Sequence, residues 1–223
     1  MNLKEYPDRE MMMLSLADQL TGELGSFLRG QERVSLAVPG GTTPGPVFDT
    51  LSSIELDWSR VDITLTDERW LPETAPRSNT RLVRKRLLQG RAAAARFVPL
   101  HADTETPEES IPELTKGLEP ILPLSVVRLG MGGNLHIASL FAGADRLAEA
   151  LSPQAPPLMA LRAPDIDEPR VTLTAPVLTA AMNVHILITG PEKRKALDRA
   201  RRLDPLEAPV RLVLDDATIH WAE

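Results

Sequence analysis

The sequence contains no cysteine among its 223 residues, which excludes disulfide bonds, thiolate metal sites and cysteine nucleophiles. It has no apolar run that approaches the roughly 20 residues of a membrane-spanning helix, so we expect no membrane association. The N-terminal stretch Met1–Asp8 carries acids where a signal peptide needs a basic and then an apolar segment. These absences together predict a cytoplasmic protein.

The composition is that of a globular protein, with 43% hydrophobic and 25% charged residues. No repeat, low-complexity tract or clear linker interrupts it, and we expect a single domain over residues 1–223. The net charge of −6 argues against binding to nucleic acid. A local basic pocket for an anionic small molecule remains compatible with this charge.

Segments with the periodicity of strands alternate along the chain with segments that have the periodicity of helices. Helices are expected at Arg9–Arg29, from Pro44, after a cap at Ser78, over Thr106–Leu122, from Pro176 and from Pro191. Strands are expected at Arg33–Val38, Val61–Thr66, Val126–Leu129, Arg170–Thr174, Val184–Thr189 and Val210–Leu214. This alternation indicates βαβ units and an α/β fold with a mostly parallel sheet.

A lone histidine, His136, follows the strand Val126–Leu129 and a glycine-rich turn, and a helix-like apolar segment follows it. This order places an imidazole at the carboxyl end of a strand, where open α/β sheets bind ligands. Imidazole titrates near neutral pH and can act as a general base. The other three histidines lie in a loop, inside an apolar strand and in the C-terminal tail, namely at His101, His185 and His220.

A second glycine-rich turn, Pro39–Pro44, joins a predicted strand to a predicted helix. Its glycines let the backbone approach a ligand, and free N–H groups at a helix start favour an anion. A tight turn with a threonine cap explains the same residues equally well. The turn is not a P-loop, because the Gly-Lys-Ser/Thr ending is missing.

Three cations lie near predicted strand ends, at Arg69, Arg170 and Lys193. Arg69 belongs to the charged cluster Asp67–Arg69 and could bind phosphate or carboxylate as a fork. Each cation, taken alone, is better explained as a surface charge than as a ligand contact. No His, Asp or Glu spacing resembles a metal site, and no Gly-x-Ser-x-Gly nucleophile turn is present.

The order of these motifs along the chain resembles that of 6-phosphogluconolactonases, in the wider group that includes glucosamine-6-phosphate deaminases/isomerases. The resemblance runs nearly from end to end. It rests on Gly40–Pro44, Thr66–Pro72 with Ser78 and Asn79, Gly130–Gly132 with His136–Phe141, Arg170–Thr174, Ile188–Lys193 and Trp221.

The resemblance implies hydrolysis of 6-phosphogluconolactone to 6-phosphogluconate in the oxidative pentose phosphate pathway, by a Rossmann-like three-layer αβα sandwich without a cofactor or metal. It implies that His136 is the general base that activates water. It further implies substrate contacts at Gly41, Thr42, Thr43, Arg69, Arg170 and Lys193. The partner would be a small-molecule sugar-phosphate lactone, and we expect a monomer or a homodimer.

The sequence departs from the pattern typical of that family around the histidine, at Asn134, Leu135, Ile137 and Ala142. The family has an aspartate at position 134, which can fix the tautomer of the histidine and stabilise its imidazolium; we therefore count Asn134 with the catalytic residues. Leu135 stands where the family has glycine and would strain a turn that needs positive φ. Arg128 interrupts an apolar strand, so we expect it to reach the surface or find a partner.

These departures lead us to expect a lactonase scaffold with a weakened catalytic loop. Two alternatives stay open. The first is a sugar-phosphate-binding protein that keeps the phosphate site and has lost catalysis. The second is an aminosugar-phosphate isomerase or deaminase. Ile137 is typical of that branch, but its pattern after the histidine, Ile-Ala-Phe-Asn-Glu-Pro, is missing its Asn-Glu-Pro here, and Ser139–Phe141 follows the lactonase form.

Overall fold

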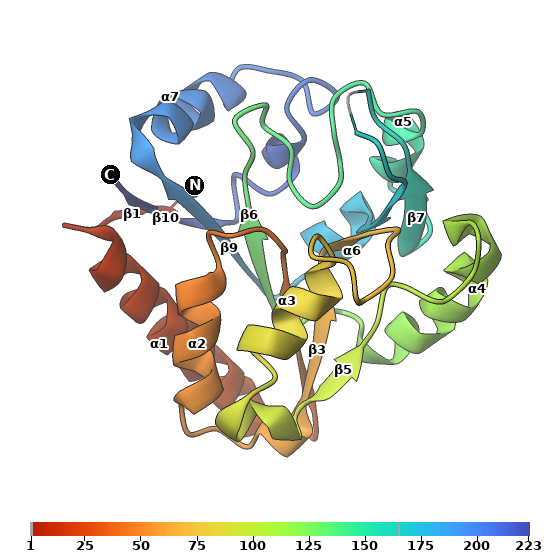
Figure 1. Ribbon diagram of the computed structural model, residues 1–223. Coiled ribbons are helices and arrows are strands. Elements are labelled where there is room, and N and C mark those ends of the chain that lie inside the picture. Colours follow the sequence, from red (N-terminus) through yellow and green to blue (C-terminus); the bar gives the residue numbers. More distant parts are fainter. Residues whose placement is uncertain (1, 165) are drawn as a thin grey trace.

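A seven-stranded parallel sheet forms the centre of the computed structural model, which describes residues 2–164 and 166–223 (Figure 1). Its strands, in order across the sheet, are β1 (Asn2–Glu5), β10 (Thr218–Ala222), β9 (Asn183–Thr189), β6 (Val126–Gly130), β2 (Val34–Val38), β3 (Val61–Leu65) and β5 (Arg96–Val98). The central strands β2 and β3 are buried at every residue, as apolar strands covered on both faces must be. Met1 and Asp165 lie outside the described residues.

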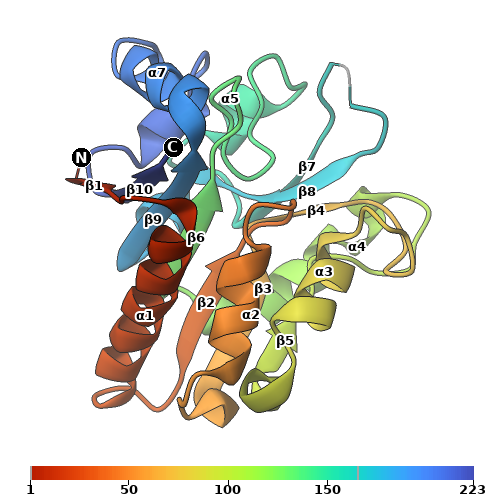
Figure 2. The same cartoon turned by 60° about the vertical axis from the view of Figure 1, so that its left-hand side comes forward.

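Helices flank this sheet, and the predicted Rossmann-like α/β architecture is confirmed (Figure 2). They are α1 (Arg9–Leu28), α2 (Gly45–Ser53), α3 (Asn79–Arg86), α4 (Pro107–Leu118), α5 (Leu147–Ala150), α6 (Ala175–Thr179) and α7 (Gly190–Ala200). Asp8 caps α1 by accepting a hydrogen bond from the Met11 N–H at 2.8 Å. Ser78 caps α3, as its position in the sequence predicts.

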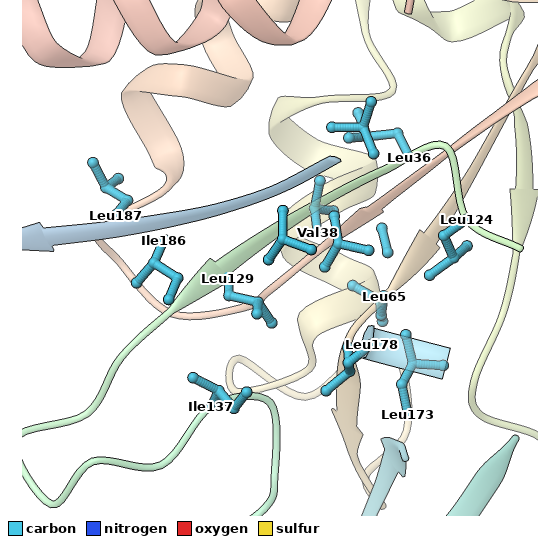
Figure 3. Packing of buried hydrophobic residues seen from close by; sticks show 14 of the residues in the cluster. Leu36, Val38, Leu65, Leu124, Leu129, Ile137, Leu173, Leu178, Ile186 and Leu187 are labelled. Atoms are coloured by element: carbon cyan, nitrogen blue, oxygen red, sulfur yellow. The ribbon is translucent and has the colours of Figure 1, made fainter. Parts of the chain in front are cut away.

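A second, antiparallel sheet of three strands packs against the first. It consists of β4 (Asp67–Arg69), β8 (Arg170–Leu173) and β7 (Leu158–Leu161). Leu173 of β8 and Leu178 of α6 lie in the same buried cluster as Leu129 of β6 (Figure 3). In this sheet Arg69 is paired with Arg170, and Asp67 with Thr172. The predicted segment Arg170–Thr174 is therefore a strand, but it belongs to this sheet rather than to the parallel one.

Two predicted elements are wrong. The segment after His136 is not a helix, because Ala138 has a φ of +48° and the chain instead closes a tight turn from Leu140 N to Ile137 O at 3.0 Å. The segment Val210–Leu214 is not a strand: Pro209 begins a short 3-10 helix over Pro209–Leu212. That edge of the sheet is formed instead by β1, which pairs with β10, so the two terminal strands lie side by side.

None of the helices in the described ranges is both long and apolar enough to cross a membrane. The longest, α1, carries Arg9, Glu10, Asp18 and Glu23 among its residues. The single domain expected over residues 1–223 stays a prediction.

Candidate active site

A pocket of about 310 Å³ lies at the carboxyl ends of β2, β6 and β9. It brings together every predicted site residue except Asn134, which contacts the pocket residue His136 from the side. The members of this set come from five separate segments of the chain: Gly41, Thr42 and Thr43; Arg69; His136; Arg170; and Lys193. Their convergence at the carboxyl edge of the sheet matches the place where open α/β sheets bind ligands.

The turn between β2 and α2 forms one wall of the pocket. Gly41 has a φ of +85°, a conformation that favours glycine. The side chain of Asn79 packs so closely on Gly40 that a Cβ atom at position 40 would collide with it. Pro44 and Pro46 have no N–H, and the Gly45 N–H donates to the Thr42 carbonyl at 3.4 Å, so the backbone donors that the turn can offer to an anion are those of residues 40–43.

His136 stands on a tight turn that its own backbone closes. The Gly132 N–H donates to the His136 carbonyl at 3.0 Å, and the Leu135 N–H donates to the Gly132 carbonyl at 3.0 Å. Leu135 has a φ of +68°, which lies in the left-handed region that favours glycine. The turn therefore has the positive φ at which the sequence analysis expects a leucine to be strained. A leucine there stores about 1–2 kcal/mol of backbone strain.

The side-chain oxygen of Asn134 faces Nδ1 of His136 at hydrogen-bond distance. Because an amide oxygen only accepts hydrogen bonds, Nδ1 must carry the proton and donate it. The lone pair of the imidazole is therefore on Nε2. Asn134 can thus fix the tautomer that a base needs, but it brings no negative charge to the imidazole.

Burial is the main cause that lowers the pKa of His136 to about 4. The charges of Arg170 and Lys193 lower it further, and the carboxylate of Asp67 acts in the opposite direction. The Phe141 ring packs on the imidazole with 4.4 Å between ring centroids. His136 is consequently neutral at pH 7 and ready to accept a proton.

Asp67 is a pocket residue that the sequence analysis leaves out of the site. It is buried, and its Oδ2 accepts a hydrogen bond from the Ser139 hydroxyl at 2.6 Å. Arg170 lies 3.9 Å from the same oxygen. Asp67 is therefore the carboxylate whose charge acts on His136, a task that the family pattern assigns to position 134.

The neighbouring Glu68 is fully buried and has a different task. Its carboxylate accepts hydrogen bonds from the N–H groups of Asn79 at 2.8 Å and Thr80 at 2.7 Å, at the start of α3. Glu68 thereby fixes α3 against β4, and with it the Asn79 side chain that lines the pocket. Sequence reasoning treats Asn79 only as a capping residue.

Arg69 and Arg170 share one acidic partner, Glu168, at 3.7 Å and 3.2 Å. Glu168 is buried and also binds Arg77 at 2.7 Å. The sequence does not predict this group of ion pairs around Glu168, because Arg69 and Arg170 are brought together only by the antiparallel pairing of β4 with β8. The carboxylate fixes the two pocket guanidinium groups and offsets part of their charge.

Lys193 and Arg128 line the pocket without such a partner. Among residues 2–164 and 166–223, neither forms an ion pair with an acid. Burial lowers the pKa of Lys193, and the charge of Arg128 lowers it further. The expectation that Arg128 reaches the surface or finds a partner is wrong: it is 1% exposed, and its Nε and Nη2 have no hydrogen-bond partner among the residues that the structure describes.

A charged residue in an apolar strand is the one sequence signal that points to Arg128 as a pocket residue. The other pocket residues outside the predicted set, such as Met131, Ala138 and Phe141, carry no signal of their own and follow from the shape of the His136 turn. The described residues contain no group of three or more His, Asp or Glu side chains placed to hold a metal ion.

Comparison with known proteins gives concordant matches over the whole chain. The family model described as glucosamine-6-phosphate isomerases/6-phosphogluconolactonase matches residues 7–221. A 6-phosphogluconolactonase of Rhizobium meliloti (strain 1021) is 40% identical over 229 residues, covering 99% of this chain and 98% of that protein. One from Mesorhizobium japonicum is 39% identical over 227 residues, covering 99% and 95%. The crystal structure of a 6-phosphogluconolactonase from Shewanella baltica OS155 aligns with a TM-score of 0.96 at 31% identity, covering 100% and 97%.

Proposed function

The chain belongs to the glucosamine-6-phosphate isomerase/6-phosphogluconolactonase family, and from this premise we propose that it hydrolyses 6-phospho-D-glucono-1,5-lactone to 6-phosphogluconate. This is the step of the oxidative pentose phosphate pathway that opens the lactone ring. The reaction needs a nucleophilic water, a base for its proton, a positive group for the oxyanion and a site for the phosphate.

The observation that carries the proposal is the orientation of His136. Its Nδ1 is engaged by Asn134, which leaves the Nε2 lone pair for water, and its ring lines the same pocket as four cations and the glycine-rich turn. A neutral imidazole with a free lone pair is the base that lactone hydrolysis needs, and it typically contributes about 10²- to 10⁴-fold.

In the proposed mechanism, Nε2 of His136 takes a proton from water as the water oxygen forms a bond to the lactone carbonyl carbon. Arg170, which lies over the Phe141 ring at 5.7 Å beside His136, stabilises the resulting oxyanion. The carbon–oxygen bond of the ring then breaks, and the imidazolium returns its proton to the departing ring oxygen. The product carboxylic acid releases its proton to solvent.

The phosphate group is assigned to the end of the pocket formed by the turn Gly41–Thr43 and Lys193. Backbone N–H groups of such a turn and an adjacent ammonium group favour a phosphate dianion. Holding the phosphate at one end positions the lactone carbonyl at the other end, where His136 lies. These steps use water and side chains of this chain and need no cofactor.

We also propose that Asn134 slows the reaction without abolishing it. An aspartate facing Nδ1 would stabilise the imidazolium that forms when His136 takes the proton, and a neutral amide does so less well. Asp67 supplies a negative charge to His136, but it shares that charge with Arg170 and Ser139.

Hydrolysis of freshly prepared lactone, corrected for its spontaneous opening, tests the activity. We expect a rate above the spontaneous one for the unaltered chain, and a loss of about 10²- to 10⁴-fold for His136→Asn. His101→Asn is the matched control, because His101 packs on Trp70 outside the pocket. Equal rates for the unaltered chain and His136→Asn would overturn the proposed role of His136.

A second candidate is a sugar-phosphate-binding protein without catalysis, which the pair Asn134 and Leu135 favours. Tight binding of 6-phosphogluconate by a chain that does not turn over the lactone would support it. The deaminase alternative is tested by ammonia release from glucosamine 6-phosphate. We expect no release, since the Asn-Glu-Pro of that branch is missing and Ser139–Phe141 follows the lactonase form.

A further inference from the structure

Arg128 occupies the middle of the central strand β6, a position where a charged side chain is costly. Its neighbours in the sheet are β2 on one side and β9 on the other. The side chain is 1% exposed and lines the floor of the pocket. Within the described part of the chain, no acceptor meets its Nε or Nη2 atoms.

The groups packed around Arg128 are already engaged. His185, its partner across the sheet, bonds to Glu23 at 2.8 Å and to His220 at 3.1 Å. The pocket residue Asp67 and the buried Glu168, which lies outside the pocket lining, are both paired with Arg170. No acid of the described chain therefore offsets the charge of Arg128.

Arg128 remains charged at neutral pH, because burial lowers its pKa only to about 9. A guanidinium group buried without an acceptor is unfavourable in the empty protein and becomes favourable when an anion enters. Its planar fork of donors fits the oxygens of a phosphate. The cavity into which it faces is the pocket already described.

The position of Arg128 indicates which end of the ligand it meets. The charges that act on His136 are those of Asp67, Arg170 and Lys193, whereas the charge of Arg128 acts on Lys193. Arg128 thus lies near Lys193, since β6 pairs with β9 and β9 leads into α7, and this is the end of the pocket to which the proposed function assigns the phosphate. Two unpaired cations at this end match the charge of a phosphate dianion, which is about −1.5 to −2 at pH 7.

We propose that Arg128 is a phosphate-binding residue that contacts the phosphate group of the ligand from the floor of the pocket, together with Lys193. The proposal takes its ligand from the proposed function. The proposed phosphate site, formed by the turn Gly41–Thr43 and Lys193, thereby gains a guanidinium group from the central strand β6. This role of Arg128 also explains why a charge is kept in an otherwise apolar strand.

Binding rather than turnover provides the test. Isothermal titration of 6-phosphogluconate, inorganic phosphate and gluconate compares the unaltered chain with Arg128→Met, Arg128→Lys and Arg91→Met. Arg91→Met removes one exposed positive charge outside the pocket and is the matched control for net charge. Arg128→Met keeps an apolar chain in the strand, and Arg128→Lys keeps the charge without the fork.

We expect Arg128→Met to weaken binding of 6-phosphogluconate and inorganic phosphate about 10- to 100-fold, since bonds to charged groups have that effect on affinity. Arg128→Lys should lie in between, and Arg91→Met should bind like the unaltered chain. The weak binding of gluconate should not change. Without ligand, Arg128→Met should be at least as stable as the unaltered chain to urea, because the uncompensated charge is gone.

Unchanged phosphate binding in Arg128→Met would overturn the proposal, as would an equal loss for gluconate or the absence of any phosphate binding by the unaltered chain. Loss of the fold in Arg128→Met would also overturn it, because Arg128 would then support the structure. A crystal structure of the unaltered chain with 6-phosphogluconate gives an independent check: the Arg128 guanidinium should lie within about 3.2 Å of a phosphate oxygen. If the lactone is not hydrolysed but Arg128→Met still loses phosphate binding, only the proposed activity fails.

Discussion

Asn134 turns its side-chain oxygen toward Nδ1 of His136, and so holds the imidazole in the tautomer whose Nε2 can accept a proton. The replacement of the family's aspartate by asparagine thus preserves the geometry of the pair and removes only its charge. In serine proteases, where asparagine in place of the aspartate of the catalytic triad imposes the wrong tautomer on the histidine, the loss in kcat is about 10⁴-fold. For this protein we expect a smaller loss, because the tautomer is the right one.

Asn134→Asp should raise kcat for lactone hydrolysis by about 10- to 100-fold, which corresponds to about 1.4–2.7 kcal/mol of stabilisation of the imidazolium in the transition state. Steady-state kinetics after correction for spontaneous hydrolysis measures it, with KM expected to change little. Asn134→Ala is the companion variant and should lower kcat, because it frees the tautomer. Equal and high rates in the unaltered chain and Asn134→Asp would contradict the idea of a weakened catalytic loop.

The pH dependence of kcat/KM gives a second prediction about the same pair. His136 must be neutral to act as a base, and its pKa is lowered to about 4, chiefly by burial. Activity should therefore stay level as the pH falls from 7 to 5 and decline only near pH 4, well below the ordinary histidine value of about 6.5. In Asn134→Asp the added carboxylate favours the protonated ring, so the acid limb should move to higher pH. An acid limb near pH 6.5 in the unaltered chain would contradict this.

Local signals in the sequence suffice for the parts of the fold that short segments determine. Ser78 caps α3 because a serine before a helix can accept the bond from Arg81 N, wherever the helix lies. The strand before the glycine turn likewise places His136 at the carboxyl edge of the sheet, because a buried apolar strand must end where the glycines begin. The positive φ expected at Leu135 is also confirmed, because it belongs to a tight turn formed by a short segment of the chain.

The features that sequence reasoning misses depend on segments far apart in the chain. Asp67 and Glu68 are adjacent, yet one faces the pocket and the other accepts hydrogen bonds from the N–H groups of α3, because successive residues of β4 point to opposite sides. The ion pairs that Glu168 makes with Arg69 and Arg170 form only because β8 lies against β4. The segment after His136 looks helical by its apolar content, but it is buried on all sides and follows the turn instead.

Substitutions of Leu135 test for backbone strain, because strain decides whether the alanine or the glycine variant is the more stable. Leu135 is 5% exposed, so both Leu135→Ala and Leu135→Gly should destabilise the protein by about 2–5 kcal/mol through lost packing. Because φ is +68°, the glycine variant should be about 1 kcal/mol more stable than the alanine variant. Urea-induced unfolding measures both.

Leu129 in β6 is the matched position for this comparison, since it is buried and lies in a regular strand. There the order should reverse, with the alanine variant more stable than the glycine variant by about 0.5–1 kcal/mol. The same order at both positions would show that the backbone at Leu135 is not strained.

A chain of hydrogen bonds buried beside the sheet has no counterpart in the sequence analysis, which assigns His220 to the tail. The Tyr6 hydroxyl bonds to Nδ1 of His220 at 2.8 Å, Nε2 of His220 to Nδ1 of His185 at 3.1 Å, and Nε2 of His185 to Glu23 at 2.8 Å. Each imidazole can donate once and accept once in this chain. These hydrogen bonds connect the residue after β1, strand β10 and strand β9 to helix α1, and so connect both terminal segments of the chain to the sheet and to α1.

His220 makes the stability of this chain of bonds sensitive to acid. Its side chain is 0% exposed, and burial, followed by the charge of His185, lowers its pKa to about 3. Below pH 6.5 the unfolded protein binds a proton at this position that the folded protein does not, so the free energy of unfolding falls as the pH falls. Between pH 7 and pH 5 the expected loss from His220 is about 2 kcal/mol. His220→Gln keeps one donor and one acceptor but cannot titrate, so urea-induced unfolding at the two pH values should show a correspondingly smaller loss. An identical loss in both proteins would mean that His220 takes no part in the acid sensitivity.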